Sequence, residues 1–492
     1  MIFLIISIQV QAITENNFIQ KKDPIENSFE IKLPDDIYEW KDGDITGEWK
    51  YKQENTQGDL KAYIKQGRKP DVGLIIGRWN TTNKKTNGLF KSILIKDKTI
   101  GIIQNKKQQN IIPFFGNIKK NNQTNFQLTL NLPINKKITI NGKYFTSFLP
   151  NLTGQYKVGI KRYHIIDNNR SEKFTPEKPE DKRKLKIQIW YPTEKQNPTI
   201  DYMDYQTFQW LKSRSPIPLF TIPNQAYKYI KTHTVNQAPV STDQKNYPLI
   251  LFSPGYDGNP EIYTSLIEDV VSHGFIVLSI NHPYISGMTI FPDGEIIKAH
   301  PIMNISLPTL IKDVQFVLNY TEILNQTHPL LKGKIDLSRI GMYGHSFGGA
   351  ATLISCYQDP RIKAGLTLDG VIYKDKIKDD INKPFMIMLA ENSFMETLAD
   401  QLWNNLSQRA YKISIRGSTH YAFTDVGILL NHFLPIIPPK ILGFGTIKPK
   451  RMINITKSYK IAFFNAYLKN NPEENIDQYS NIFDEVIYDK KT

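Results

Sequence analysis

Cysteine is nearly absent from this sequence. The 492 residues contain a single one, Cys356, which excludes an intramolecular disulfide and any zinc site built from cysteine thiolates. No stretch reaches the roughly 18 apolar residues that a membrane-spanning helix requires. An Asp-rich calcium loop is also missing. We therefore expect a fold stabilised by burial alone, with no metal and no cofactor.

The chain also lacks an arginine-rich patch with interleaved aromatic residues, which is the pattern typical of nucleic-acid binding. Its net charge is nevertheless +15. The lysines responsible are spread among abundant Ile and Asn, which is typical of a composition bias of the whole chain. We expect no nucleic-acid partner, while the positive charge would suit a peripheral, anionic lipid surface.

The N-terminal segment resembles a targeting sequence. Residues 1–12 form a short apolar run that ends in Val10-Gln11-Ala12, which is typical of a signal peptide, although the basic n-region is missing. This pattern predicts a secreted or periplasmic protein. The alternative is an ordinary buried N-terminal strand, in which case the protein would be cytoplasmic. Residues 13–40 are polar and are predicted to be a linker.

The length of the chain predicts two domains, because one core seldom holds so many residues. Residues 41–148 show the period-two alternation of short antiparallel strands, for example Phe126-Leu128-Leu130-Leu132. Asn141-Gly142 predicts a hairpin turn, since both central positions of such a turn favour positive φ. We expect a small all-β domain here. We expect it either to bind a surface or a glycan, or to shield a sheet edge or the entrance to the active site.

Residues 149–492 alternate between strand and helix patterns, which predicts an α/β domain with a mostly parallel sheet covered on both faces. Residues 249–252 and 275–280 are predicted as buried strands around a helix at 261–272. Further strands are expected at 365–368, 385–389 and 411–415, and a helix at 458–468.

The most informative segment is Gly344-His345-Ser346-Phe347-Gly348, which lies between a strand pattern and a helix pattern. This is the composition of a nucleophile elbow, in which the serine adopts a strained turn and a Cβ at either glycine would collide with neighbouring backbone. We interpret His345 as a filler of the elbow rather than as a base. Order and spacing predict an α/β-hydrolase that performs acyl transfer.

A serine hydroxyl needs a histidine base and an orienting carboxylate, which follow it along the chain in this fold. Two histidines lie after the elbow. His420, in a glycine-containing loop past a strand, is the favoured base, whereas His432 has the surroundings of a packed side chain. Asp369, at the end of a strand, is the favoured acid, and Glu391, one strand later, is the alternative.

The oxyanion of an acyl-transfer reaction is expected to accept hydrogen bonds from two backbone N–H groups. One is that of Phe347, directly after the nucleophile. The second should come from residues 253–258, which follow the first core strand and contain two glycines. Our candidate for it is the N–H of Tyr256.

These residues resemble the platelet-activating factor acetylhydrolases of the plasma and intracellular type II kind, which are serine lipases. The resemblance covers about residues 149–470 and rests on five groups of motifs, namely 152–159 with 187–192, Phe252-Ser253-Pro254-Gly255, 272–277, the elbow 344–349, and Leu368-Asp369-Gly370 with Gly417-Ser418-Thr419-His420. It implies a triad of Ser346, Asp369 and His420, and oxyanion donors at Tyr256 and Phe347.

The resemblance thus implies a serine esterase, without metal, that cleaves short or oxidised sn-2 acyl esters of glycerophospholipids. The elbow and the His-Gly-Phe segment are shared with cutinase-like polyester hydrolases, so a polyester hydrolase or a general carboxylesterase is the alternative. An alternative of another class is a surface- or glycan-binding protein defined by the β domain.

Overall fold

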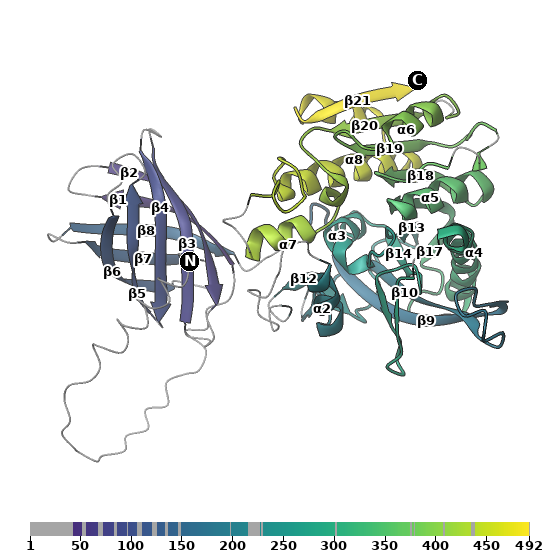
Figure 1. The fold of residues 1–492 in the computed structure, drawn as a ribbon, viewed down its shortest axis with the longest axis horizontal. Helices are drawn as coiled ribbons and strands as arrows, with labels where there is room; N and C mark the ends of the chain where they lie inside the picture. Colours follow the sequence, from purple (N-terminus) through teal and green to yellow (C-terminus); the bar gives the residue numbers. More distant parts are fainter. Residues whose placement is uncertain are drawn as a thin grey trace, which may run out of the picture. The chain divides into compact units, whose positions relative to one another are not determined.

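A computed structural model gives the fold of the chain (Figure 1). It describes residues 43–51, 56–66, 72–82, 86–95, 97–105, 111–120, 125–132, 136–145, 149–196, 198–214, 227, 230–300, 303–373, 376–377, 379–406, 409–433 and 438–491. The predicted signal peptide at 1–12 and the linker at 13–40 lie outside these residues. The chain divides into two compact units, Met1–Tyr144 and Phe145–Thr492.

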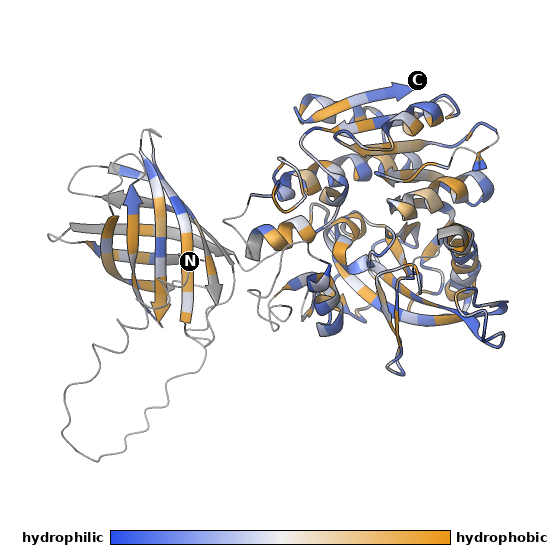
Figure 2. Ribbon diagram, in the orientation of Figure 1, coloured by the Kyte–Doolittle hydropathy of each residue, from blue (hydrophilic) through white to orange (hydrophobic). Residues whose placement is uncertain are grey.

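The first unit contains a closed barrel in which each strand pairs antiparallel with the next along the chain. Its strands are β1 (Gly43–Tyr51), β2 (Thr56–Gln66), β3 (Val72–Thr81), β4 (Asn87–Ile95), β5 (Lys98–Asn105), β6 (Ile111–Lys120), β7 (Asn125–Leu132) and β8 (Lys136–Phe145). Alternating apolar side chains fill the interior, among them Ile64, Ile75, Phe90 and Phe114. Figure 2 shows the same alternation as orange bands along the strands.

The predicted all-β domain is therefore present, but the predicted hairpin at Asn141-Gly142 is wrong. Both residues lie within β8, where they pair with Gln127 and Phe126 of β7. A turn at this point would leave only Lys143–Phe145 for a returning strand. Continuing β8 instead extends its pairing along β7, and this gain outweighs the local preference of Asn-Gly for a turn.

The second unit is built on an 11-stranded sheet in the order β11-β12-β9-β10-β14-β13-β17-β18-β19-β20-β21. The pairings from β14 through β13, β17, β18 and β19 to β20 are parallel. The strands are β9 (Lys157–Ser171), β10 (Lys182–Thr193), β11 (Thr199–Asp201), β12 (Lys231–Asn236), β13 (Tyr247–Ser253), β14 (Ile276–Asn281), β17 (Ile335–His345), β18 (Ile362–Leu368), β19 (Phe385–Ala390), β20 (Ala410–Ile415) and β21 (Val486–Lys491). A small separate ribbon joins β15 (Met288–Ile290) and β16 (Ile296–Lys298).

Helices cover both faces of this sheet (Figure 1). One apolar core includes side chains of α3 and α8, and the other includes side chains of α4 and α5. The helices are α2 (Tyr205–Ser213), α3 (Thr264–Ser272), α4 (Met303–Thr327), α5 (Phe347–Gln358), α6 (Glu396–Trp403), α7 (Val426–Phe433), α8 (Pro449–Lys469) and α9 (Glu474–Asp477). Single turns of 3₁₀ helix are η4 (Pro260–Tyr263), η6 (His420–Phe423) and η7 (Gln478–Asn481).

The expected parallel strands and covering helices are thus found in the second unit. The sequence did not predict the antiparallel edge strand β21. Its six residues do not alternate between apolar and polar, and the last three are Asp489, Lys490 and Lys491. Within the residues that the structure describes, no helix combines the length and the apolarity that crossing a membrane would demand.

Candidate active site

Ser346 lies on a sharp turn between β17 and α5, where its backbone has φ 54° and ψ −117°. A residue other than glycine holds such a conformation only where its surroundings enforce it. A Cβ on Gly344 would lie 2.2 Å from the carbonyl oxygen of Gly348, and a Cβ on Gly348 would lie 2.1 Å from that of Ser253. Only glycine fits at either position, so the turn depends on both.

The register of the parallel strands brings the candidate residues to one edge of the sheet. Ser253 at the end of β13 pairs with Gly344 of β17, and His345 pairs with Leu368 at the end of β18. The residues that follow these strands therefore emerge side by side, at the carboxyl edge where open α/β sheets bind ligands.

Asp369 follows β18 and contacts His420 directly. Its carboxylate is fully buried, and Oδ2 lies 2.6 Å from Nδ1 of His420. Its Oδ1 accepts a hydrogen bond from the N–H of Ala390 at 3.0 Å. Burial alone would raise the pKa of Asp369, but hydrogen bonds from His420, Ser393 and Ala390 outweigh it and hold the pKa below its usual range. The carboxylate is thus charged and positioned to orient the imidazole.

Backbone hydrogen bonds tie Ser346 to both sides of this carboxylate. The N–H of Ser346 donates to the carbonyl of Leu368 at 2.9 Å, and the N–H of Val371 donates to the carbonyl of Ser346 at 3.0 Å. The turn that carries the serine and the turn that carries Asp369 are therefore one hydrogen-bonded unit.

His345 links the elbow to the loop of His420. Its Nε2 lies 2.9 Å from the carbonyl oxygen of His420, which can only accept, so Nε2 carries the proton. Its Nδ1 then accepts from the hydroxyl of Tyr263 at 2.8 Å. Burial, with the nearby His420, holds the pKa of His345 far below its usual range and keeps the ring neutral. His345 is a structural bridge, and no local signal pointed to its partner Tyr263.

The two candidate oxyanion donors flank Ser346. Phe347 is the first residue of α5, where backbone N–H groups have no partner within the helix. Gly255 approaches so closely that a Cβ on it would lie 3.2 Å from Cβ of Ser346. Tyr256 follows at once, and its ring meets that of Phe347 edge to face at 6.4 Å. The loop and the helix start thus converge beside the serine.

The two alternative residues lie in different settings. Glu391 follows β19, and its Oε2 accepts from the N–H of Gly417 at 2.9 Å, so it supports the loop that precedes His420. His432 lies on α7, whereas His420 begins η6 directly after that loop. The structure therefore pairs His420 with Asp369.

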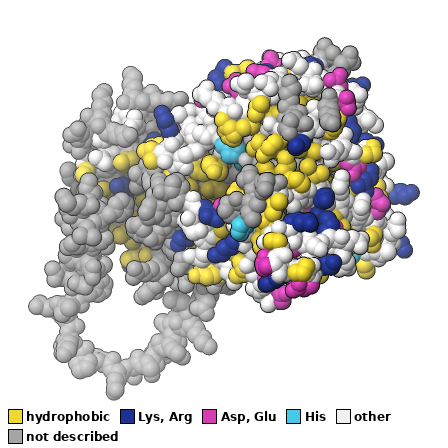
Figure 3. Space-filling model, turned by 45° about the vertical axis from the view of Figure 1, so that its right-hand side comes forward, with side chains coloured by type: hydrophobic (Ala, Val, Ile, Leu, Met, Phe, Trp, Pro, Cys, Tyr) yellow, Lys and Arg dark blue, Asp and Glu magenta, His cyan; other side chains and the backbone are white. Residues whose placement is uncertain are grey.

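A cavity of about 420 Å³ opens beside this site. Tyr256 and Tyr421 line it together with side chains of α2 and α7, and its lining is mostly apolar. The other lining residues are Phe208, Trp210, Leu211, Lys212, Arg214, Asp257, Ile262, Thr424, Val426, Leu429, Leu430, Leu442, Gly443 and Phe444. Figure 3 shows hydrophobic side chains gathered on one face, with Lys and Arg around them. Arg214 pairs with Asp257 at 2.8 Å. In the described part of the chain, no three His, Cys, Asp or Glu side chains could share a metal ion.

The chain is similar to several known proteins. The chain is 27% identical over 270 residues to a probable 1-alkyl-2-acetylglycerophosphocholine esterase of Arthroderma benhamiae, which covers 50% of the chain and 67% of that protein. It is 23% identical over 290 residues to the platelet-activating factor acetylhydrolase of Cavia porcellus, covering 52% and 65%. It is 27% identical over 202 residues to cutinase 2 of Thermobifida cellulosilytica, covering 41% and 66%. The chain thus spans about two thirds of the length of these relatives.

Among solved structures, a ferulic acid esterase from Streptomyces cinnamoneus superposes with a TM-score of 0.59 at 26% identity, covering 70% of this chain and 99% of that one. Its likeness supports the fold class that the sheet and the elbow define, which is an α/β-hydrolase. The relatives are carboxylic ester hydrolases by name, and this is the enzyme class of the chain. Residues 141–295 and 292–486 match the family described as platelet-activating factor acetylhydrolase, isoform II, and the chain belongs to that family.

Proposed function

We propose that the chain is a serine esterase that hydrolyses short or oxidised sn-2 acyl esters of glycerophospholipids. The observation that carries this proposal is the 2.6 Å hydrogen bond between His420 and the buried Asp369, beside the strained Ser346. In the proposed reaction Ser346 is the nucleophile, His420 the general base and Asp369 the group that orients it.

The reaction proceeds in two halves. Nε2 of His420 takes the proton of Ser346 while Oγ bonds to the ester carbonyl carbon, and the carbonyl oxygen becomes an oxyanion held by the N–H groups of Phe347 and Tyr256. His420 then protonates the departing alcohol, which leaves an acyl-enzyme. Water attacks the acyl-enzyme while His420 takes a proton from it, and His420 then returns this proton to Oγ of Ser346 as the acid is released. Asp369 stays ionised throughout, as its low pKa favours.

Two observations support a phospholipid substrate. One relative, from Arthroderma benhamiae, is a probable 1-alkyl-2-acetylglycerophosphocholine esterase. The cavity beside Tyr256 has an apolar lining that would hold an acyl chain, and Lys212 among its lining residues would supply positive charge for a phosphate, because Arg214 is already paired with Asp257.

The test is the rate of hydrolysis of phosphatidylcholines that differ only in the sn-2 acyl group, with Ser346→Ala protein as the blank. We expect cleavage of acetyl and short oxidised chains and little turnover of long ones. Untouched phospholipids together with rapid cleavage of simple esters would contradict the lipid substrate and leave the serine mechanism in place.

A second candidate function is that of a general carboxylesterase or cutinase-like polyester hydrolase. It is favoured by the aromatic side chains Phe208, Trp210 and Phe444 in the cavity and by the likeness to a ferulic acid esterase. A feruloyl ester and a polyester film, assayed beside the acetylated phospholipid, distinguish the two. Higher kcat/KM on the feruloyl ester or the film would favour this candidate.

We further propose that residues 1–12 direct export to a secreted or periplasmic location, where the positively charged chain works as a peripheral protein on anionic lipid. The test of export is N-terminal sequencing of protein recovered outside the cytoplasm, which should begin directly after Ala12. An intact Met1 in a cytoplasmic fraction would contradict it.

Sedimentation with anionic vesicles, at low and high salt, tests the association with lipid.

A further inference from the structure

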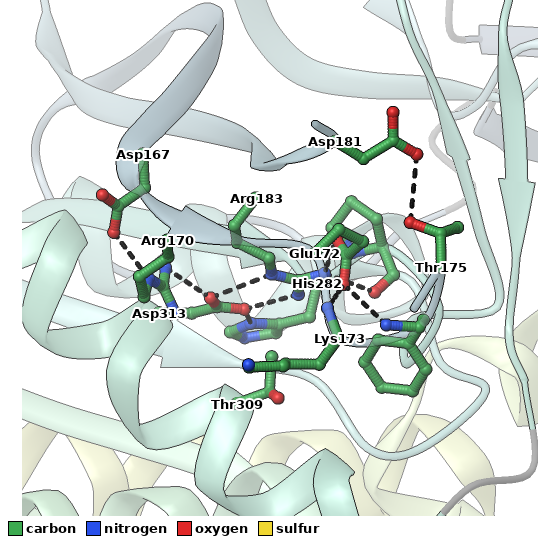
Figure 4. A network of polar contacts seen from close by, with 12 residues as sticks. Asp167, Arg170, Glu172, Lys173, Thr175, Asp181, Arg183, His282, Thr309 and Asp313 are labelled. Carbon is green, nitrogen blue, oxygen red and sulfur yellow. Dashed lines mark hydrogen bonds and ion pairs between the residues drawn. The ribbon is translucent and has the colours of Figure 1, made fainter. Parts of the chain in front are cut away.

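Asp313 of α4 is completely buried, yet three cationic or imidazole side chains converge on it (Figure 4). Arg183 contacts its two oxygens at 2.6 and 3.1 Å, Arg170 contacts one at 2.8 Å, and Nδ1 of His282 lies at 2.9 Å. Arg183 also donates to Glu172 at 3.0 Å. Buried charges of this kind are tolerated only when each is paired and hydrogen-bonded, as here.

The network extends from Asp313 to the end of β13. Because the carboxylate can only accept, Nδ1 of His282 carries the proton of the neutral ring. Nε2 of His282 lies 3.1 Å from Oγ of Ser253 and accepts a hydrogen bond from this hydroxyl. Ser253 is the last residue of β13 and is fully buried. Its own carbonyl oxygen lies so close to Gly348 that a Cβ on that glycine would be only 2.1 Å away. The chain of hydrogen bonds thus ends beside the nucleophile elbow.

The loop that follows His282 holds the candidate oxyanion loop at two further points. The N–H of Asp257 donates to the carbonyl of Ile285 at 2.9 Å, and the N–H of Gly287 donates to the carbonyl of Gly258 at 3.3 Å. Both loops contain a strained residue, since Asp257 has φ 55° and Tyr284 has φ 67°. Such conformations are unfavourable for a residue other than glycine and persist only where other contacts enforce them.

We infer that Ser253, His282 and Asp313 are positioning residues that fix the backbone N–H of Tyr256 at the place where the oxyanion forms. The inference rests on the proposed function. The three residue types are those of a catalytic triad, but Ser253 and His282 are 0% and 1% exposed and cannot meet a substrate. Their part is to hold Ser253, at the start of the oxyanion loop, while the hydroxyl of Tyr263 accepts a hydrogen bond from the N–H of Gly255 at 3.4 Å.

The test compares Ser253→Ala with Ser279→Ala in the full chain. Ser279 is a matched control because it is an equally buried serine on the neighbouring strand β14, where its hydroxyl contacts Trp190 and Gln188 instead. We expect Ser253→Ala to lower kcat on p-nitrophenyl acetate roughly tenfold with KM nearly unchanged, because the donor is displaced rather than removed. It should raise the inhibition constant of a trifluoromethyl ketone, whose adduct places an oxyanion in the same hole, by a similar factor.

Thermal unfolding of both variants gives their melting temperatures, and all rates are measured well below the lower of the two. A loss of rate then reflects the position of the Tyr256 N–H and not partial unfolding. Equal effects of the two substitutions on kcat, or a change confined to KM, would overturn the inference. A wild-type protein that hydrolyses no ester would contradict the proposed function, and the inference would fall with it. If the wild type is active and the Ser253→Ala variant is unimpaired, the inference is wrong while the proposed function stands.

Discussion

The barrel and the α/β unit solve the problem of a stable interior in different ways. Among the barrel side chains that the structure describes, the buried polar ones are the hydroxyls of Ser92 and Thr99, and the interior is otherwise apolar. The α/β unit instead buries ionisable side chains completely, including Asp313, Asp425 and Lys460. Burying a charge costs several kcal/mol even when it is paired.

The difference teaches what buried charge is for in this molecule. Alternating apolar residues suffice to close the barrel, whereas two buried carboxylates of the α/β unit contact histidines that follow parallel strands at the carboxyl edge of the sheet. Asp369 holds His420, and Asp313 holds the residues behind the oxyanion loop. Substitutions of Asp369 and of the chain Ser253, His282 and Asp313 should therefore affect catalysis, whereas substitutions in the barrel interior should affect only stability.

The largest effect is expected for Ser346→Ala. Without the hydroxyl no acyl-enzyme can form, and kcat should fall by at least about 10⁴-fold. The fold should remain, because Ser346 shapes the turn through its backbone and Ala has the same Cβ. Ester hydrolysis and thermal unfolding of the purified variant measure both quantities. Full activity in a protein with the wild-type melting temperature would exclude Ser346 as the nucleophile.

The choice between the two candidate acids gives the next largest effect. Asp369→Asn keeps the shape of the side chain but removes the charge that orients His420, and kcat should fall roughly 10³- to 10⁴-fold. Glu391→Gln is the matched control, since an amide oxygen can still accept from the N–H of Gly417. We expect it to change kcat less than about threefold. A larger loss in Glu391→Gln than in Asp369→Asn would reverse the assignment.

The fold class and the elbow could be predicted because their causes are local. Gly344 and Gly348 are dictated by collisions within one turn, and the strand and helix patterns around them are continuous in sequence. The buried chain behind the oxyanion loop could not be predicted in this way. Ser253, His282 and Asp313 are separated by 29 and 31 residues and meet only because β13 and β14 are neighbours and α4 packs across them.

The errors have the same origin. Asn141-Gly142 carries a strong local turn signal, but pairing with β7 decides its conformation. The edge strand β21 has too little apolar alternation to be detected, and its pairing with β20 defines it. In each case a partner far away in the sequence outweighs the local preference, which is the general limit of propensity arguments for strands.

Asp425→Asn tests a buried carboxyl group outside the proposed triad and should affect stability more than activity. Asp425 accepts hydrogen bonds from Tyr202 and from the backbone and hydroxyl of Ser265. Burial raises its pKa to about 7, whereas an unfolded Asp has a pKa of about 3.9. Between these values the folded protein binds more protons, so the free energy of unfolding contributed by this group falls as pH rises from about 4 to about 7.

The variant cannot titrate at this position, so the difference in melting temperature between wild type and Asp425→Asn should change across that pH window and level off above it. Thermal unfolding at closely spaced pH values measures the difference, in which groups common to both proteins cancel. A difference that is constant from pH 4 to pH 8 would show that the carboxyl does not titrate there. We expect kcat at neutral pH to change only a fewfold.

The smallest effect on catalysis is expected from the barrel interior. Phe114 is fully buried and its ring stacks on Phe90 at 5.1 Å, so Phe114→Ala should lower the free energy of unfolding of the barrel by about 3–5 kcal/mol. Phe464→Ala is the control in the other unit, because its equally buried ring packs under Gly341 of the elbow strand. Calorimetry should show the two substitutions lowering different transitions.

Ester hydrolysis should be unchanged for Phe114→Ala and reduced for Phe464→Ala, since only the second loosens the strand that carries Ser346. If Phe114→Ala lowered kcat as much as Phe464→Ala, the barrel would be part of the catalytic machinery, and a role for it in binding a surface or a glycan apart from catalysis would lose its support.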